Sequence, residues 1–169
     1  CTGQVRFVGD IVAMILADDP YVALDGTECV EVTYDPMRGT TSFEGALADD
    51  APLLHPGTRS NVAYEGAFAT EGFDDIHASA PRRLKRRFRK QRLAVVPMEA
   101  RGCIARFDAA TGQLTFWTSS QVPHLVQRAI AEHIGLEEID VRVIVPDMGG
   151  GFGMKTVIYP EELLVAKAA

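Results

Sequence analysis

The chain has 169 residues, of which 47% are hydrophobic and 24% charged, and its formal net charge is −6 at pH 7. This length and composition predict a globular protein with its own core and exclude a disordered chain, a fibrous repeat and a disulfide-stapled miniprotein. No apolar run approaches the roughly 20 residues of a membrane-spanning helix, and the negative charge disfavours a general binder of nucleic acid or anionic membranes.

The first 35 residues predict a β-β-α-β unit. The apolar and β-branched pattern over 4–17 is typical of two strands, the second of which is expected to be buried on both faces. An aspartate N-cap followed by Pro20 at the first helical turn predicts a short helix over about 20–29. Alternation of apolar and polar residues over 30–34 then predicts a third, half-exposed strand.

The middle of the chain carries a connecting segment and a basic run. Residues 38–60 are rich in Gly, Asp, Thr and Pro and predict a linker with one helical turn near Glu44–Leu47. Residues 82–92 hold eight of the 17 basic residues and no acidic one. Three interpretations are open: a phosphate-binding segment with a stacking Phe88, a basic helix with Leu84 and Phe88 on one edge, or a solvated strand. Solvation is the simplest of the three.

The C-terminal part predicts a mixed arrangement of strands and helices. Strand-like runs at 103–107 and 114–118 are joined by turn residues and predict a hairpin. Apolar residues at helical spacing predict a helix over 123–134 with a glycine cap at its C-terminus. Alternating valines over 141–145 predict a further strand, and a helix is expected from about Pro160.

A glycine loop, defined here as residues 149–153, lies between that last strand and helix. Four of its five residues are glycine, so its backbone can adopt positive φ and turn N–H groups towards a ligand, which favours an anionic group. The P-loop pattern fails because Met154 stands where a glycine is required, and no dinucleotide-binding pattern begins at Gly149 or Gly151. A ligand-free turn between strand and helix is the alternative interpretation.

Two polar side chains are further candidates. Gln121 is either an exposed first-turn residue beside a serine helix cap, or an amide that offers a donor and an acceptor to a ligand. Glu99 is either a solvated strand-end acid or a partly buried acid paired with Arg92 or Arg101. Neither metal-ligand spacing nor a redox pair occurs among the histidines and cysteines, which are His55, His77, His124, His133, Cys1, Cys29 and Cys103. A reducing compartment is therefore expected.

Three motifs in a fixed order carry a resemblance to one family. They are Gln-Arg-Leu-Ala-Val-Val-Pro-Met-Glu-Ala-Arg-Gly at 91–102, Trp-Thr-Ser-Ser-Gln-Val-Pro-His at 117–124, and Pro-Asp-Met-Gly-Gly-Gly-Phe-Gly-Met-Lys at 146–155, followed by Tyr-Pro-Glu-Glu at 159–162. Together they resemble the large, molybdopterin-binding subunit of the xanthine oxidase, aldehyde oxidase and aerobic carbon monoxide dehydrogenase family.

The resemblance implies an α+β fold in two parts. The segments at 5–13 and 30–36 look like the end of that family's α/β hammerhead domain. We therefore expect a partial hammerhead domain and linker at 1–60, followed by the first part of a molybdopterin-binding domain, with mixed sheets and helices, at 61–169. The start at Cys1 and a last helix without a stop signal add the expectation that the chain is a piece of a longer protein.

The same resemblance implies cofactor contacts inside this chain. It assigns Gln121 to a hydrogen bond with an oxo ligand of molybdenum. It assigns Gly150, Gly151, Phe152 and Gly153 to backbone contacts with the pterin and the metal, with Phe152 also bordering the substrate cavity. None of these residues is a direct metal ligand. The family's catalytic base glutamate lies downstream of this chain, so no catalytic residue is assigned here and the isolated chain is expected to be inactive.

The activity implied is that of a molybdenum-dependent hydroxylase acting on an aldehyde, an N-heterocycle or a similar small molecule, with water as the oxygen source. The expected cofactor is molybdopterin cytosine dinucleotide with molybdenum, while electrons leave through 2Fe-2S clusters and FAD on partner subunits or domains. We expect a cytoplasmic dimer of heterotrimers with medium (FAD) and small (iron–sulfur) subunits, and no membrane or nucleic-acid partner. Thr156 stands where purine-oxidising members carry a glutamate, which counts against xanthine oxidation. The alternative function is a noncatalytic module that binds an acidic partner or nucleic acid through 82–92.

Overall fold

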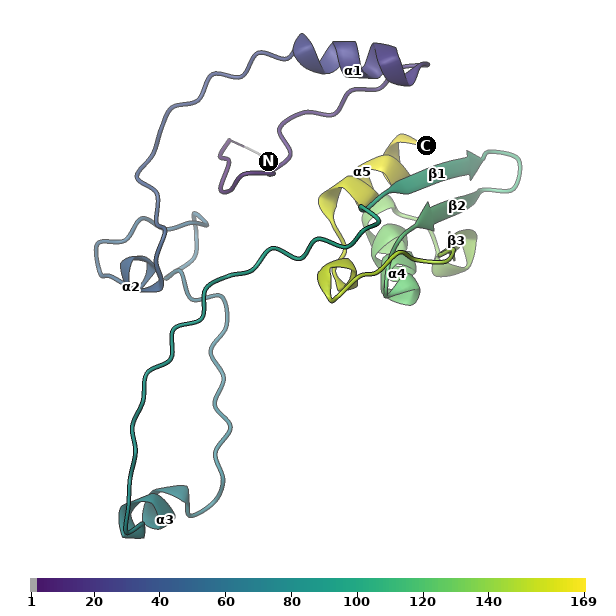
Figure 1. The fold of residues 1–169 in the computed structure, drawn as a ribbon. Coiled ribbons are helices and arrows are strands. Elements are labelled where there is room, and N and C mark those ends of the chain that lie inside the picture. The colour runs from purple at the N-terminus through teal and green to yellow at the C-terminus, as the bar shows by residue number, and fades with distance from the viewer. Residues whose placement is uncertain (1–2) are drawn as a thin grey trace. The chain divides into compact units, whose positions relative to one another are not determined.

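The computed structural model describes residues 3–169, so Cys1 lies outside the described residues. The chain divides into two compact units, an N-terminal unit that ends at Arg89 and a C-terminal unit that begins at Lys90. Within the described residues, regular structure in the first unit is helical only, whereas the second unit contains the sheet (Figure 1). No helix in the described part of the chain is long and apolar enough to cross a membrane.

The helices of the N-terminal unit are α1 (Pro20–Glu28), α2 (Phe43–Ala46) and α3 (Phe73–Ser79). Helix α1 confirms the predicted helix, and its N-cap Asp19 accepts hydrogen bonds from the N–H groups of Tyr21 and Val22 at 2.7 and 3.3 Å. Helix α2 confirms the turn predicted near Glu44–Leu47. Helix α3 has no counterpart among the predicted elements, because it begins at the left-handed Gly72 without a side-chain cap that would mark it in the sequence.

The strands predicted over 4–17 and 30–34 are not formed. Residues 3–89 contain no β-strand, and Val12, Leu16 and Val32 in these segments are exposed. A strand exists only through hydrogen bonds to a neighbouring strand, and alternation within one segment does not supply that neighbour. The predicted β-β-α-β unit is therefore wrong apart from its helix, and the hammerhead domain stays a prediction.

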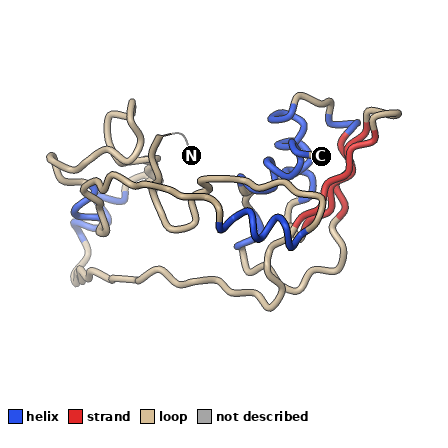
Figure 2. The backbone as a smooth tube through the Cα atoms, turned by 90° about the horizontal axis from the view of Figure 1, so that it is seen from above, coloured by secondary structure: helices blue, strands red, loops and turns tan. Residues whose placement is uncertain are grey.

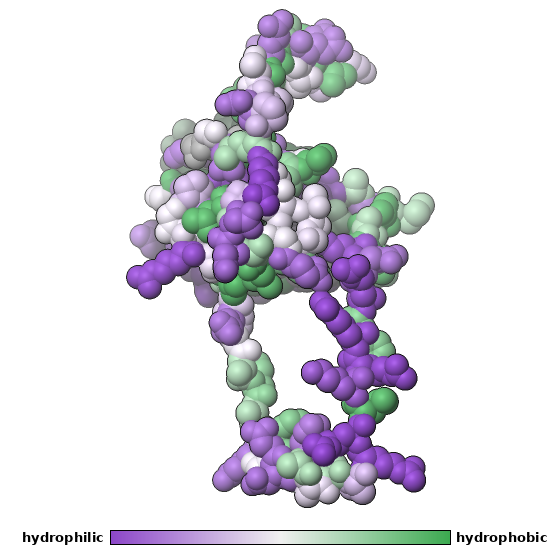
Figure 3. Space-filling model, turned by 90° about the vertical axis from the view of Figure 1, so that its left-hand side faces the viewer, coloured by the Kyte–Doolittle hydropathy of each residue, from purple (hydrophilic) through white to green (hydrophobic). Residues whose placement is uncertain are grey.

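The basic run 82–92 is extended and exposed along its whole length. Hydrophilic side chains line one of the two extended stretches that lead to α3 (Figure 3). Arg87 and Arg89 both contact the carboxylate of Glu44, at 2.9 and 3.6 Å. Ion pairs this exposed are typically worth about 0–1 kcal/mol. The interpretation of this run as a basic helix is therefore wrong, and its charges are solvated.

The C-terminal unit is built on a three-stranded sheet with the order β1-β2-β3 (Figure 2). Its strands are β1 (Cys103–Asp108), β2 (Gln113–Thr118) and β3 (Val141–Ile144). Strands β1 and β2 form the predicted antiparallel hairpin, with Ala105 opposite Phe116. Strand β3 lies parallel to β2, with Val143 opposite Phe116. A parallel pair needs a crossover connection, which α4 (Pro123–Ile134) supplies.

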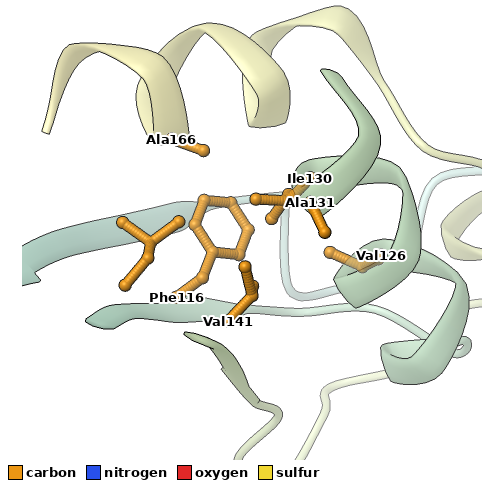
Figure 4. Close-up of a cluster of buried hydrophobic side chains, with 7 residues drawn as sticks. Phe116, Val126, Ile130, Ala131, Val141 and Ala166 are labelled. Carbon is orange, nitrogen blue, oxygen red and sulfur yellow. The ribbon is translucent and has the colours of Figure 1, made fainter. Parts of the chain in front are cut away.

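Helices α4 and α5 (Pro160–Ala168) pack against the sheet and enclose the core (Figure 4). Leu114 and Phe116 alternate with less buried residues on β2, so both point towards the same face. Helix α4 has the predicted bounds and ends at Gly135, which caps it in the left-handed conformation with a φ of 82°. The buried hydrophobic residues of this core are Leu114, Phe116, Val126, Ile130, Ala131, Val141 and Ala166.

Two connections leave the same edge of this sheet. Strand β2 continues through residues 119–122 into α4, and β3 continues through the glycine loop and η2 (Met154–Thr156) into α5. A second 3-10 helix, η1 (Glu138–Asp140), precedes β3. Because the carboxyl ends of neighbouring parallel strands meet at one edge, the fold brings Gln121 next to the glycine loop.

Candidate functional site

The glycine loop turns sharply through backbone conformations that ordinary residues avoid. Gly150 and Gly153 have φ values of 93° and 85°, and Phe152 has a φ of 50°, the only positive value of a non-glycine residue within the described chain. The N–H of Met154 donates to the carbonyl of Gly151 at 2.9 Å and closes the turn. A left-handed Phe152 costs about 1–2 kcal/mol. The residue is 78% exposed, so packing within the described residues does not offset this strain.

Gln121 is fixed to the glycine loop through both its backbone and its side chain. Its N–H donates to the carbonyl of Lys155 at 2.9 Å, and its side-chain Oε1 accepts from the N–H of Gly153 at 3.1 Å. Because Oε1 is used in this way, the amide is oriented with its NH₂ group as the outward donor. No acceptor for that NH₂ group occurs among residues 3–169.

The interpretation of Gln121 as a residue beside a serine helix cap is wrong. The N-cap of α4 is Val122, which makes no side-chain capping bond. Ser120 is buried, where its hydroxyl accepts from the N–H of Val122 at 3.1 Å and donates to the carbonyl of Lys155 at 3.3 Å. These bonds tie the segment after β2 to Lys155, two residues beyond the glycine loop.

Two glycines of the loop leave room for particular side chains. Gly151 is buried and its φ lies outside the left-handed region, but a Cβ atom there would overlap the carboxamide of Gln121. A Cβ atom on Gly149 would lie 2.5 Å from the Cβ atom of Glu99. The sequence therefore needs glycine at these two positions for close approach, whereas Gly150 and Gly153 need it for their backbone conformation.

An ion pair between Glu99 and Lys155 lies at the base of the loop. Lys155 Nζ is 2.7 Å from Glu99 Oε2, and the side chains are 0% and 38% exposed, respectively. The same Oε2 atom accepts from the N–H of Gly149 at 2.9 Å. The Lys155 ammonium, followed by the Gly149 N–H, holds the pKa of the Glu99 carboxyl below its ordinary value.

The predicted arginine partners of Glu99 are wrong. Arg101 instead pairs with Glu161, and its guanidinium lies 3.4 Å from the centre of the Tyr159 ring. Lys155 is 56 residues from Glu99 along the chain, and no local pattern in the sequence joins them. The one sequence signal is the position of Lys155 two residues after the glycine loop, at the end of the third motif.

The unpaired donors of this region face no acceptor of the protein. The backbone N–H groups of Gly150, Gly151 and Phe152 have no partner among the described residues, whereas the N–H groups on either side, at Gly149 and Gly153, are bonded to side chains. Together with the NH₂ group of Gln121, they form a set of donors from two neighbouring segments. This arrangement suits a ligand rich in hydrogen-bond acceptors or negative charge.

A pocket lies behind this site, between the end of β2 and the start of α5. Its lining includes Cys103, Ser119 and Tyr159. Burial, followed by the negative charge of Glu162, raises the pKa of the Cys103 thiol, which keeps it protonated at neutral pH and unreactive. No group of three or more His, Cys, Asp or Glu side chains that could hold a metal ion occurs in residues 3–169.

The chain is similar to known proteins over more than its three sequence motifs. The family described as the molybdopterin cofactor-binding domain matches residues 54–169. The chain is 35% identical over 170 residues to the carbon monoxide dehydrogenase large chain of Hydrogenophaga pseudoflava, covering 93% of this chain and 21% of that protein. It is 31% identical over 172 residues to the nicotine 6-hydroxylase large subunit of Paenarthrobacter nicotinovorans, covering 98% and 20%. The chain thus spans about a fifth of the length of the curated relatives that it matches.

Solved structures give similar results. Quinoline 2-oxidoreductase from Pseudomonas putida 86 matches with a TM-score of 0.77 at 33% identity, covering 89% of this chain and 19% of that chain. The Cu,Mo-CO dehydrogenase in its carbon monoxide reduced state matches with a TM-score of 0.75 at 33% identity, covering 90% and 21%. Both likenesses extend beyond the C-terminal unit into the N-terminal one.

Proposed function

The chain belongs to the family of molybdopterin-binding large subunits that includes xanthine oxidase, aldehyde oxidase and aerobic carbon monoxide dehydrogenase, and from this premise we propose that it forms part of the cofactor site of a molybdenum hydroxylase. The observation that carries the proposal is the set of donors left free by the glycine loop and Gln121. These donors matter more than the fold, because a shared fold alone does not determine chemistry.

The residues present fit a molybdopterin cofactor. Oxo, sulfur and phosphate groups accept hydrogen bonds, and the free N–H groups of Gly150, Gly151 and Phe152 donate them. A Cβ atom on Gly153 would meet no atom of the protein within 4 Å, so the backbone there is open to a ligand. When bound, the cofactor would supply the two-electron chemistry by which oxygen from water is added to a carbon atom of the substrate.

Each residue has a distinct role in this proposal. Gln121 would donate from its NH₂ group to an oxo ligand of the molybdenum, and its orientation for this is already set by the bond from Gly153. The loop N–H groups would hold the pterin and the metal group from one side. Phe152 projects an exposed aromatic ring from the loop and would border the substrate. No described residue is assigned as a metal ligand or as the general base.

The form of the cofactor, the partner subunits and the substrate are also proposals, and the relatives support them. Their names describe a "large chain" and "large subunit" and refer to carbon monoxide, nicotine and quinoline. We propose the cytosine dinucleotide form of the cofactor, medium and small partner subunits with FAD and iron–sulfur clusters, a dimer of heterotrimers in the cytoplasm, and an aldehyde or N-heterocycle as substrate. Thr156 disfavours a purine substrate. A partial hammerhead domain at 1–60 and a molybdopterin-binding domain at 61–169 complete the proposal, the second supported by the match at 54–169.

The test is the substitution Gln121→Ala in the protein at its full natural length. Loss of one hydrogen bond to the metal centre costs on the order of 1–3 kcal/mol, so hydroxylase turnover should fall by about one to two factors of ten while molybdenum content stays close to that of the wild type. Gln113→Ala is the matched control, since Gln113 is an exposed glutamine at the far end of β2. Wild-type turnover in a molybdenum-loaded Gln121→Ala protein would contradict the role proposed for Gln121.

A further inference from the structure

The ion pair between Glu99 and Lys155 poses a question of energetics. A fully buried ammonium group loses its hydration, and a single carboxylate rarely compensates for that loss with net stability. Glu99 lies outside the sheet and outside the buried hydrophobic core. The pair is therefore poorly placed to stabilise the fold as a whole, and a local effect on the loop explains its position better.

The contacts of Glu99 are directed at the first residue of the glycine loop. Its Oε2 atom accepts from Gly149 at 2.9 Å and from Lys155 Nζ at 2.7 Å, and its backbone N–H donates to the carbonyl of Gly149 at 3.3 Å. One carboxylate oxygen thus joins Gly149, at the start of the loop, to Lys155, two residues after its end. A segment with four glycines has many accessible conformations, and this bridge restricts them at both ends.

Lys155 extends the same bridge to Gln121. While its side chain binds Glu99, its backbone carbonyl accepts from the N–H of Gln121 at 2.9 Å and from the hydroxyl of Ser120 at 3.3 Å. Gln121 in turn accepts from Gly153 through Oε1. A shift of Lys155 would therefore move the backbone of Gln121 and the far end of the loop together.

We propose that Glu99 and Lys155 are positioning residues, whose ion pair holds the glycine loop and Gln121 in the arrangement that presents their free donors to one ligand. The ligand is the acceptor-rich cofactor group of the proposed function, on which this inference rests. The pair itself touches no substrate in this account. It acts through Gly149 at one end of the loop and through Gln121 at the other.

The experiment is amide hydrogen exchange on the full-length protein freed of cofactor, comparing wild type with Glu99→Gln and Lys155→Met. Glu99→Gln keeps the shape of the side chain and an acceptor for Gly149 but loses the charge that binds Lys155. The reporter amides are those of Gly153 and Met154, which are bonded in the loop and do not touch the substituted Glu99. We expect their exchange to accelerate by about tenfold or more, and by a clearly larger factor than the exchange of the β2 amides.

The matched control is Glu162→Gln. Glu162 is a carboxylate in the same unit, buried where Glu99 is only partly so, bonded to the hydroxyl of Thr118 at 2.7 Å and to the N–H of Tyr159 at 3.0 Å, and it makes no contact with the glycine loop. Glu162→Gln should lower the free energy of unfolding without selectively accelerating the exchange of the loop amides. The double variant Glu99→Gln/Lys155→Met should resemble the single variants, because the two residues act as one unit.

The same variants, purified with cofactor, separate the two claims. Glu99→Gln should retain less molybdenum than Glu162→Gln at equal global stability. Unchanged exchange at Gly153 and Met154 in Glu99→Gln, or acceleration spread equally over β2, would overturn the positioning role. A wild-type protein that holds no molybdenum would overturn the proposed function instead, and the exchange comparison would still decide whether the ion pair orders the loop.

Discussion

Replacing Gly151 by alanine tests whether the loop glycine exists for close approach to Gln121. The added Cβ atom would overlap the Gln121 carboxamide, so that side chain must leave its place and lose the hydrogen bond from Gly153. Gly135→Ala, at the C-cap of α4, provides a matched comparison outside the loop. There the new Cβ atom meets nothing within 4 Å, but the backbone has a φ of 82°, which strains any residue with a side chain.

The two substitutions should cost similar free energy for different reasons. Gly151 has no left-handed strain to add, so the cost is that of moving a flexible, exposed glutamine and breaking one hydrogen bond, about 1–2 kcal/mol. Gly135→Ala should cost about 1–2 kcal/mol from the left-handed backbone alone. A general loss of stability would therefore affect both variants equally, whereas displacement of Gln121 is expected only in Gly151→Ala.

The assay combines urea unfolding with molybdenum content and turnover of the full-length protein. We expect comparable losses in the free energy of unfolding, and a much larger loss of molybdenum and turnover in Gly151→Ala than in Gly135→Ala. Equal molybdenum content and equal turnover in the two variants would refute the reasoning that connects Gly151 to Gln121 and to the cofactor.

Three further substitutions test the core, the ion pair and the loop tip. Phe116→Ala removes a completely buried ring and should lower the free energy of unfolding by about 3–5 kcal/mol in urea titration; a loss under about 1 kcal/mol would contradict the assigned core. Because the folded-state pKa of Glu99 lies below the ordinary 4.5, its stabilisation relative to Glu99→Gln should be present at pH 7 and vanish as pH falls through the lowered pKa; a difference between the urea curves of the two proteins that does not shrink as pH is lowered would exclude this. Phe152→Ala removes an exposed ring and should change relative kcat/KM values among substrates with molybdenum retained, and an unchanged substrate range would remove Phe152 from the substrate boundary.

Elements with both a pattern and an end signal could be predicted from the sequence. Helix α4 has the expected bounds because Pro123 fits its first turn and Gly135 its left-handed cap. The hairpin of β1 and β2 was recognisable because its two strands and its turn are contiguous. The strands expected over 4–17 failed because strand formation depends on a partner elsewhere, which a single segment does not specify.

The sequence indicated which residues belong to the candidate site but not which of them contact one another. The sequence identified Gln121 and the glycine loop as separate candidates, and the structure joins them through the bond between Gln121 Oε1 and Gly153. The partner of Glu99 was missed because Lys155 is buried only after β3 and the loop fold back against the segment before β1. Pairings between distant residues follow from tertiary packing, and no local spacing encodes them.

The proposal that this chain forms part of a molybdopterin cytosine dinucleotide site is tested most directly by one measurement. It is the amount of molybdenum and of cytidine monophosphate released from the purified full-length protein. We expect about one molybdenum atom and one cytidine monophosphate per polypeptide, because one set of loop and Gln121 donors serves one cofactor. Absence of both from a folded protein produced in a host that makes the cofactor would contradict this proposal.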